Sequence, residues 1–186
     1  FSNWESPILI VAKKSPGGGD PSWRFCVDFR KVNSITKATM NFPLPSFDQI
    51  VDAVASKKPK FFTLCDLRSG YNQMKISPES QDKTTFVTPT GSWKYRYLPF
   101  GLKLAPFYFQ ALMARVLSGL MFEHTLAFID DILVYSGEFD EHLNHIETVF
   151  ERLRMAKLKL HPSKCSFAMH SLEYLGHNLS EHGLMK

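Results

Sequence analysis

The sequence contains few cysteines and no segment suited to a membrane. Three cysteines occur among 186 residues, Cys26, Cys65 and Cys165, an odd number at wide spacing. This pattern argues against a disulfide framework and is typical of a reducing compartment. No apolar run approaches the roughly 20 residues of a membrane-spanning helix. The first residue, Phe1, begins no signal peptide. We therefore expect an intracellular chain with no membrane partner, cut from a longer protein.

Several functional signatures are also missing. No G-x-x-x-x-G-K-[ST] segment occurs, which argues against a P-loop ATPase. Cys165, His170 and His177 lack zinc-ligand spacing, and His142 and His145 are expected on the polar side of a helix. The net charge of +4 tolerates a polyanionic partner but does not require one.

What the chain does contain is enough apolar material for a folded core. Hydrophobic residues make up 44% of the sequence and aromatic residues 13%. Ser46 and Gln49 predict a capping box at the start of a helix. Apolar periodicity and turn residues predict strands at 8–14, 23–29, 60–66, 126–129 and 132–135, helices at 46–58, 105–120 and 140–158, and hairpins at 84–98 and around 178–183. This irregular order indicates the α+β class.

The segment LAFIDDILVYS places Asp130 and Asp131 side by side in an apolar run. Burying two adjacent carboxylates is costly, so we expect a tight turn that takes both out of the strands. Asp66 ends the predicted strand 60–66. If that strand lies beside the acidic hairpin, three carboxylates meet at one sheet edge, where hard divalent cations such as Mg²⁺ would stabilise them. An Asp-Asp pair is also common in ordinary solvated turns, and these residues by themselves leave both interpretations open.

The segments around these aspartates resemble the reverse transcriptase domain of Ty3/gypsy-like long-terminal-repeat retrotransposons. The matching segments follow the family's order over nearly the whole chain: WRFCVDFRKVN, NFPLPSFDQI, FFTLCDLRSGYNQMKI, KTTFVTPTGSWKYRYLPFGLKLAPFYFQALM, FIDDILVYS, HLNHIETVFERL, LKLHPSKCSF and LEYLGH.

The resemblance implies a right-hand polymerase architecture with an antiparallel palm sheet backed by helices and without a thumb. Fingers are expected at 1–59 and 76–104, and palm at 60–75 and 105–186. The implied activity is RNA-directed and DNA-directed DNA synthesis within a Pol polyprotein. Thumb, RNase H, protease and integrase segments would belong to the rest of that polyprotein, and its expected location is a cytoplasmic virus-like particle or the nucleus.

The resemblance also implies catalytic roles. Asp66 and Asp130 match the principal metal-binding aspartates, Asp131 the third acidic position, and the backbone carbonyl of Leu67 a further metal contact. Two Mg²⁺ ions are expected, with Mn²⁺ as a substitute. Lys164 matches a lysine proposed to protonate the leaving pyrophosphate, and an ordinary surface lysine is the alternative.

Further residues match positions that bind the deoxynucleotide (dNTP). Tyr71 is expected under the incoming sugar, where its ring excludes a 2′-hydroxyl. Arg24 and Lys14 are expected on the triphosphate, with Lys13 as the alternative to Lys14. Phe100 and Gly101 match the segment that packs against nucleotide and template.

The implied macromolecular partners are an RNA template and a DNA primer/template duplex. Phe128 stands where the family usually has Tyr and is expected beneath the primer end. Lys94 and Arg96 are candidates for phosphate contact, although either also suits a solvated surface.

Rival functions use the same carboxylates. A catalytically silent or domesticated relative would only bind nucleic acid or a protein. A two-metal nuclease is a further alternative, but the sequence has no acid-histidine nuclease pattern.

Overall fold

The computed structural model describes residues 2–12, 23–37, 42–181 and 183–185, and the chain forms two compact units. The first unit contains residues 1–39 and 74–105, and the second contains 40–73 and 106–186. The segment 42–59 lies in the second unit, where Ile50 and Val54 pack in the cluster on one face of its sheet. The expected division into fingers and palm stays a prediction.

The first unit is built from hairpins and short helices. β1 (Ile8–Ala12) and β2 (Trp23–Val27) form the expected antiparallel hairpin, and β4 (Phe86–Thr88) pairs with β5 (Gly91–Trp93). The second strand of the latter hairpin ends at Trp93, earlier than residue 98. The helical segments of the first unit are α1 (Arg30–Ile35), α3 (Pro78–Gln81) and the 3₁₀ turn Asp82–Thr84.

The second unit contains a sheet with the strand order β6-β7-β3-β8, in which neighbouring strands are antiparallel. These strands are β3 (Phe61–Asp66), β6 (Thr125–Phe128), β7 (Asp131–Ser136) and β8 (Ser166–Met169). A smaller sheet consists of β9 (Ser171–Tyr174), β10 (His177–Ser180) and β11 (Gly183–Met185). The helices are α2 (Phe47–Lys57), α4 (Ala105–Val116) and α5 (Phe139–Met155), and 3₁₀ turns span Gly70–Gln73 and Pro162–Lys164.

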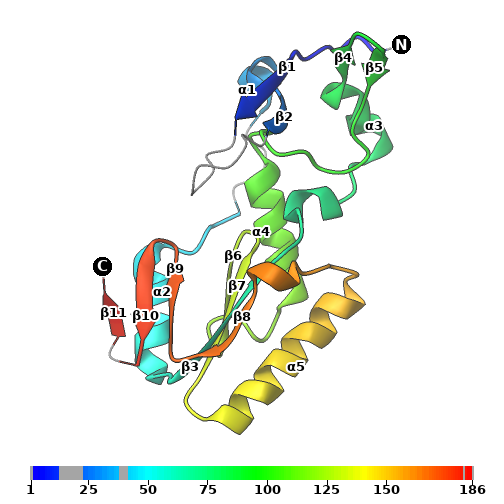
Figure 1. Ribbon diagram of the computed structural model, residues 1–186. Coiled ribbons are helices and arrows are strands. Elements are labelled where there is room, and N and C mark those ends of the chain that lie inside the picture. Colours follow the sequence, from blue (N-terminus) through cyan, green and yellow to red (C-terminus); the bar gives the residue numbers. More distant parts are fainter. Residues whose placement is uncertain (1, 13–22, 38–41, 182, 186) are drawn as a thin grey trace. The chain divides into compact units, whose positions relative to one another are not determined.

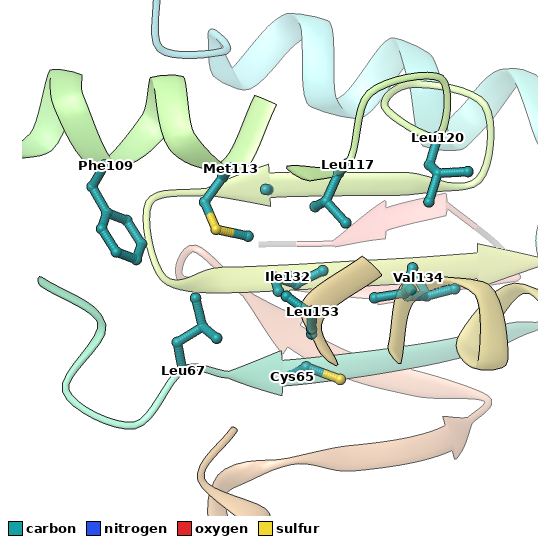
Figure 2. Close-up of a cluster of buried hydrophobic side chains, with 11 residues drawn as sticks. Cys65, Leu67, Phe109, Met113, Leu117, Leu120, Ile132, Val134 and Leu153 are labelled. Carbon is teal, nitrogen blue, oxygen red and sulfur yellow. The ribbon is translucent and has the colours of Figure 1, made fainter. Parts of the chain in front are cut away.

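Hydrophobic clusters lie on both faces of the larger sheet, whose strands and flanking helices can be followed in Figure 1. On one face, α4 and α5 pack over β3 and β7, with Phe109, Met113, Leu153 and Ile132 fully or almost fully buried (Figure 2). On the other face, α2 and the strands β9 and β10 cover the sheet through Ile50, Leu172, Leu179 and their neighbours. The inner part of the sheet is therefore a buried layer, whereas its edge strand β8 exposes Phe167 and Met169. No helix among the described residues is long and apolar enough to cross a membrane.

The N-terminal cap of α2 agrees with the sequence prediction, whereas the buried face of α5 does not. Ser46 and Gln49 form the predicted reciprocal capping box. In α5 we expected His142 on the polar side. Instead His142 is completely buried, while the neighbouring Leu143 is 47% exposed. The buried imidazole is tolerated because both ring nitrogens have hydrogen-bond partners, Thr63 and Ser136.

The acidic hairpin β6–β7 has a shorter turn than expected, and the C-terminal strands form a three-stranded sheet. Asp131 does not leave the ladder but begins β7, so the turn consists of Ile129 and Asp130. Ile129 has a φ of 58°, which lets the two-residue turn match the twist of its strands. The β10–β11 hairpin lies around 178–183, as expected. A further turn at Leu175 and Gly176, both with positive φ, adds β9 as a third strand.

Candidate active site

Four of the predicted site residues form a row across the end of the larger sheet. The β6–β7 register places Phe128 opposite Asp131, and the β7–β3 register places Asp131 opposite Asp66. On the other side of β3, Leu64 pairs with Ser166, and Lys164 ends the 3₁₀ turn Pro162–Lys164 that precedes this strand. The Lys164 ammonium group lies 3.1 Å from an Asp66 carboxylate oxygen. Directly opposite residues project from the same face of a sheet, so the row concentrates these groups at one place.

Asp130 lies at the turn beside this row. Its carbonyl accepts a hydrogen bond from the backbone N–H of Leu67 at 3.2 Å, which ties the acidic turn to the end of β3. Gly70 makes room for it, because a Cβ atom added to Gly70 would lie 3.0 Å from the Asp130 Cβ and 3.0 Å from the Phe109 ring. The structure therefore brings Asp66, Asp130 and Asp131 to the same end of the sheet, as expected, although their roles stay predictions.

A buried amide that the sequence analysis did not single out supports the acidic turn. Gln110, 1% exposed on α4, donates to the carbonyl of Ala127 at 2.8 Å and accepts from the N–H of Ile129 at 2.8 Å. These backbone groups lie just before Asp130, where the strand ladder stops. The signal available in the sequence was one amide side chain inside the apolar helical segment FYFQALM.

Burial and like charges set the electrostatics of the carboxylates. Burial raises the pKa of Asp130 above its usual value, and the negative charge of Asp66 adds to this shift. Burial also raises the pKa of Asp131, with further contributions from Asp130 and Asp66. Lys164 opposes both shifts. A cation near these groups therefore stabilises their ionised form.

Tyr174 contributes an unusual buried hydroxyl close to the same charges. Burial, and then the charge of Asp131, raises the pKa of Tyr174. Within the part of the chain that the structure describes, this hydroxyl has no hydrogen-bond partner. An unpaired buried donor costs free energy and can be used by a ligand or solvent molecule.

The donor set at this edge has the chemistry of a hard divalent cation site, because its ligands would be carboxylate oxygens. The described residues nevertheless contain no group of three or more His, Cys, Asp or Glu side chains arranged to hold a metal ion. Lys164 compensates part of the negative charge through its ion pair with Asp66. The three carboxylates are thus the kind of ligand that Mg²⁺ prefers, but the Asp66 carboxylate is paired with Lys164 in this structure.

Tyr71 and Leu67 lie on the loop that follows β3. The ring of Tyr71 packs edge-to-face on Phe109 with centroids 5.3 Å apart, and burial followed by the charge of Asp130 raises the pKa of Tyr71. The Leu67 side chain is 1% exposed and belongs to the core. Gln73 secures the loop through hydrogen bonds to Arg68 and Lys159.

The remaining predicted site residues belong to the first unit. Arg24 is exposed on β2, and Arg96 is exposed beyond β5. Lys94 pairs with Asp82 at 2.6 Å. Phe100 is 40% exposed beside Gly101, whose φ of 94° suits glycine. Lys13 and Lys14 lie outside the described residues.

Comparison with known families is decisive at this point. Residues 11–179 match the family described as reverse transcriptase (RNA-dependent DNA polymerase). The chain belongs to this family. The reverse transcriptase domain is 38% identical over 185 residues to the retrovirus-related Pol polyprotein from transposon 412 of Drosophila melanogaster, covering 99% of this chain and 15% of that protein. It is 34% identical over 183 residues to the polyprotein from transposon gypsy of the same organism, covering 98% and 17%.

The domain therefore spans less than a fifth of the length of these curated relatives. A more distant relative, the transposon Tf2-3 polyprotein of Schizosaccharomyces pombe, is 29% identical over 177 residues, covering 95% of this chain and 13% of the relative. These relatives confirm the predicted Ty3/gypsy-like family.

Solved structures confirm the α+β fold of the reverse transcriptase domain. The prototype foamy virus protease-reverse transcriptase has a TM-score of 0.82 and 26% identity, covering 95% of this chain and 22% of that chain. The foamy viral protease-reverse transcriptase in complex with RNA/DNA hybrid has a TM-score of 0.82 and 23% identity, covering 98% and 23%.

Proposed function

We propose that this chain carries the polymerase site of a retrotransposon Pol polyprotein and extends a DNA primer on an RNA or DNA template. The observation that carries the proposal is the row in which Asp131 and Asp66 are cross-strand partners, with Asp130 held beside them by Leu67. Membership of the reverse transcriptase family and the RNA/DNA hybrid bound by the foamy viral relative support it.

The carboxylates would hold two Mg²⁺ ions, which supply charge neutralisation for the primer 3′-hydroxyl and the nucleotide phosphates. In the present arrangement Lys164 pairs with the Asp66 carboxylate, so its ammonium group would compete with a divalent cation for this ligand. The same ammonium group would supply a proton to the departing pyrophosphate. Asp66, Asp130 and Asp131 act by position and charge rather than by covalent catalysis.

The nucleotide-binding roles are part of the same proposal. Tyr71 would select deoxynucleotides by its ring, which Phe109 orients through the edge-to-face contact. Arg24, Lys14, Phe100 and Gly101 would bind the dNTP, and Phe128, Lys94 and Arg96 the primer and template.

Primer extension on poly(rA)/oligo(dT) with Mg²⁺ tests the proposal, both for the 186-residue chain and for a polyprotein that contains it. Asp130→Asn should abolish extension. Asp140→Asn is the matched control, because Asp140 is an exposed aspartate in the first turn of α5. Extension that survives Asp130→Asn would contradict the mechanism.

A binding-only relative is the second candidate. Two observations favour it: the ion pair of Lys164 with Asp66, and carboxylates that are not grouped around a metal site among the described residues. Such a relative would retain a primer/template duplex in a binding assay but give no extension with either Mg²⁺ or Mn²⁺.

A further inference from the structure

One residue before Asp66 along β3, a second row of cross-strand neighbours brings together two cysteines that are 100 positions apart in the sequence. In the same registers, Ala127 lies opposite Ile132, and Ile132 lies opposite Cys65. The pairing of Leu64 with Ser166, extended by one residue, places Cys165 opposite Cys65. Cys165 has extended backbone angles, φ −89° and ψ 142°, which continue the strand direction.

Side-chain packing agrees with this register. Cys65 is fully buried in the cluster beneath α4 and α5, and Cys165 packs against that cluster (Figure 2 shows Cys65). The thiols are close enough to interact electrostatically. Opposite residues of antiparallel strands have Cα atoms about 4.5–5.5 Å apart. Disulfide-bonded cysteines have Cα atoms about 4.4–6.8 Å apart, so little backbone movement is needed to join the two sulfurs.

The two thiols differ in access. Cys65 has 0% exposure, whereas Cys165 is partly exposed and its Sγ lies 3.4 Å from the carbonyl oxygen of His161. An oxidant from solvent can therefore reach Cys165 first, and Cys65 can react afterwards from within the core. Cys26, the remaining cysteine, is partly exposed and belongs to the other unit.

We propose that Cys65 and Cys165 form an oxidation site that a peroxide converts to a cross-strand disulfide directly beneath the Asp66–Lys164 pair. In the first step the sulfur of Cys165 attacks one peroxide oxygen, the O–O bond breaks, and one water and a sulfenic acid result. In the second step the sulfur of Cys65 attacks the sulfur of Cys165, and the sulfenic oxygen leaves as water with the thiol proton. Two thiols are oxidised, one peroxide is reduced, and two waters are formed.

The site has a consequence for catalysis, which rests on the proposed polymerase function. Cys65 immediately precedes Asp66, and Cys165 immediately follows Lys164. A bond between the two sulfurs holds these backbones together and keeps the Lys164 ammonium on the Asp66 carboxylate. Oxidation therefore opposes release of Asp66 to a divalent cation and slows primer extension.

Peptide mapping tests the covalent part without reference to activity. The wild-type chain is treated with hydrogen peroxide, its remaining thiols are alkylated, and it is digested without reductant. We expect a peptide pair linked through Cys65 and Cys165, loss of two of the three alkylatable thiols, and full reversal by dithiothreitol. Cys26→Ser should leave the link intact, and both Cys165→Ser and Cys65→Ala should remove it.

Several results would overturn the assignment: a sulfinic acid on Cys165 with Cys65 still alkylatable, links that involve Cys26, or no loss of thiols. The wild-type map decides this even if a cysteine variant folds poorly.

Activity is measured in parallel on the Cys26→Ser protein. Peroxide should reduce its rate of primer extension by about tenfold or more, because mutation of groups that support metal ligands typically lowers activity by that factor. Dithiothreitol should restore the rate. Cys165→Ser should keep its rate after the same treatment. Equal rates for linked and reduced protein would refute the catalytic consequence. Absence of extension from the reduced protein would instead count against the polymerase function, while the peptide map still decides the disulfide.

Discussion

The side-chain oxygen of Gln110 accepts a hydrogen bond from the backbone N–H of Ile129, and its amide nitrogen donates to the carbonyl of Ala127. Replacement by leucine, Gln110→Leu, removes the partner of the buried Ala127 carbonyl and of the partly buried Ile129 N–H. Each orphaned group costs about 1–3 kcal/mol, so the free energy of unfolding in urea should fall by at least that amount. Primer extension should also fall, because the acidic turn loses its support.

The control for that variant is Gln73→Leu, which removes comparable amide hydrogen bonds at a partly exposed position. Water can replace those bonds, so its loss of stability should be smaller. Equal losses for the two variants would show that burial of Gln110 is not what matters.

Gly70→Ala tests the space around Asp130. The added Cβ atom would lie 3.0 Å from both the Asp130 Cβ and the Phe109 ring, and such overpacking costs about 1–3 kcal/mol. We expect lower thermal stability and reduced extension. Gly137→Ala is the control, since no described atom lies within 4 Å of the corresponding Cβ position. A stable and fully active Gly70→Ala protein would disprove the close contact.

Lys164→Met tests whether the Lys164 ammonium group competes with a divalent cation for Asp66, without a large change in stability. The Lys164 side chain is 59% exposed, so loss of its ion pair with Asp66 should change the unfolding free energy by less than about 1 kcal/mol. Removal of the competing cation should lower the Mn²⁺ concentration needed for half-saturation, while extension slows for lack of a proton donor. Lys60→Met, which breaks an exposed pair with Glu138, should leave Mn²⁺ binding unchanged. Unaltered Mn²⁺ affinity in Lys164→Met would argue against competition.

The buried His142 should limit stability in acid. Burial, followed by the nearby His145, lowers the pKa of His142 from 6.5 to about 4, and Glu141 partly opposes this shift. The unfolded chain binds the proton near pH 6.5, and the folded chain does so only near pH 4. The contribution of His142 to the free energy of unfolding is therefore fully present above pH 6.5. It declines as the pH falls toward 4, by no more than about 3 kcal/mol.

Urea unfolding at several pH values measures this decline. His142→Gln, which cannot take up a proton, should show a shallower decline than the wild-type chain between pH 6.5 and 4. Parallel curves for the two proteins would assign the acid sensitivity to other groups, such as His124 and His145, whose pKa values burial also lowers.

Tyr71→Val tests the proposed sugar selection. A smaller side chain leaves room for a 2′-hydroxyl, so ribonucleotide incorporation relative to deoxynucleotide incorporation should rise by about tenfold or more. Competition assays with rATP and dATP measure the ratio. Tyr108→Val, at an exposed tyrosine of α4, should leave the ratio unchanged. Unchanged sugar selectivity in Tyr71→Val would reject the assignment.

Local chemistry made some of this structure predictable. The Ser46–Gln49 capping box and the strand that ends in Asp66 follow from residue type and spacing, and the ordered motifs identified the family. The convergence of Asp66 with the acidic turn was also expected, since an isolated pair of carboxylates in an apolar run requires a compensating environment.

Other features depend on tertiary pairing that no local pattern encodes. The position of His142 inside the core depends on Thr63 and Ser136, which come from two different strands. The pairing of Cys65 with Cys165 depends on the β3–β8 register, which is offset by an irregularity between Phe62 and Leu64. Gln110 could not be assigned a role until the strand ends that it bridges had been located.

The central position of β3 restricts which length changes the domain can tolerate during evolution. Strand β7 is aligned to β3 residue by residue and β8 pairs with it across one irregularity, so Asp66 has Asp131 of β7 on one side and the Lys164 side chain on the other. Deletion or insertion of a single residue within Phe61–Asp66 would turn every following side chain to the opposite face. Sequence drift in β3 should therefore proceed by substitution, with changes of length confined to the connecting turns.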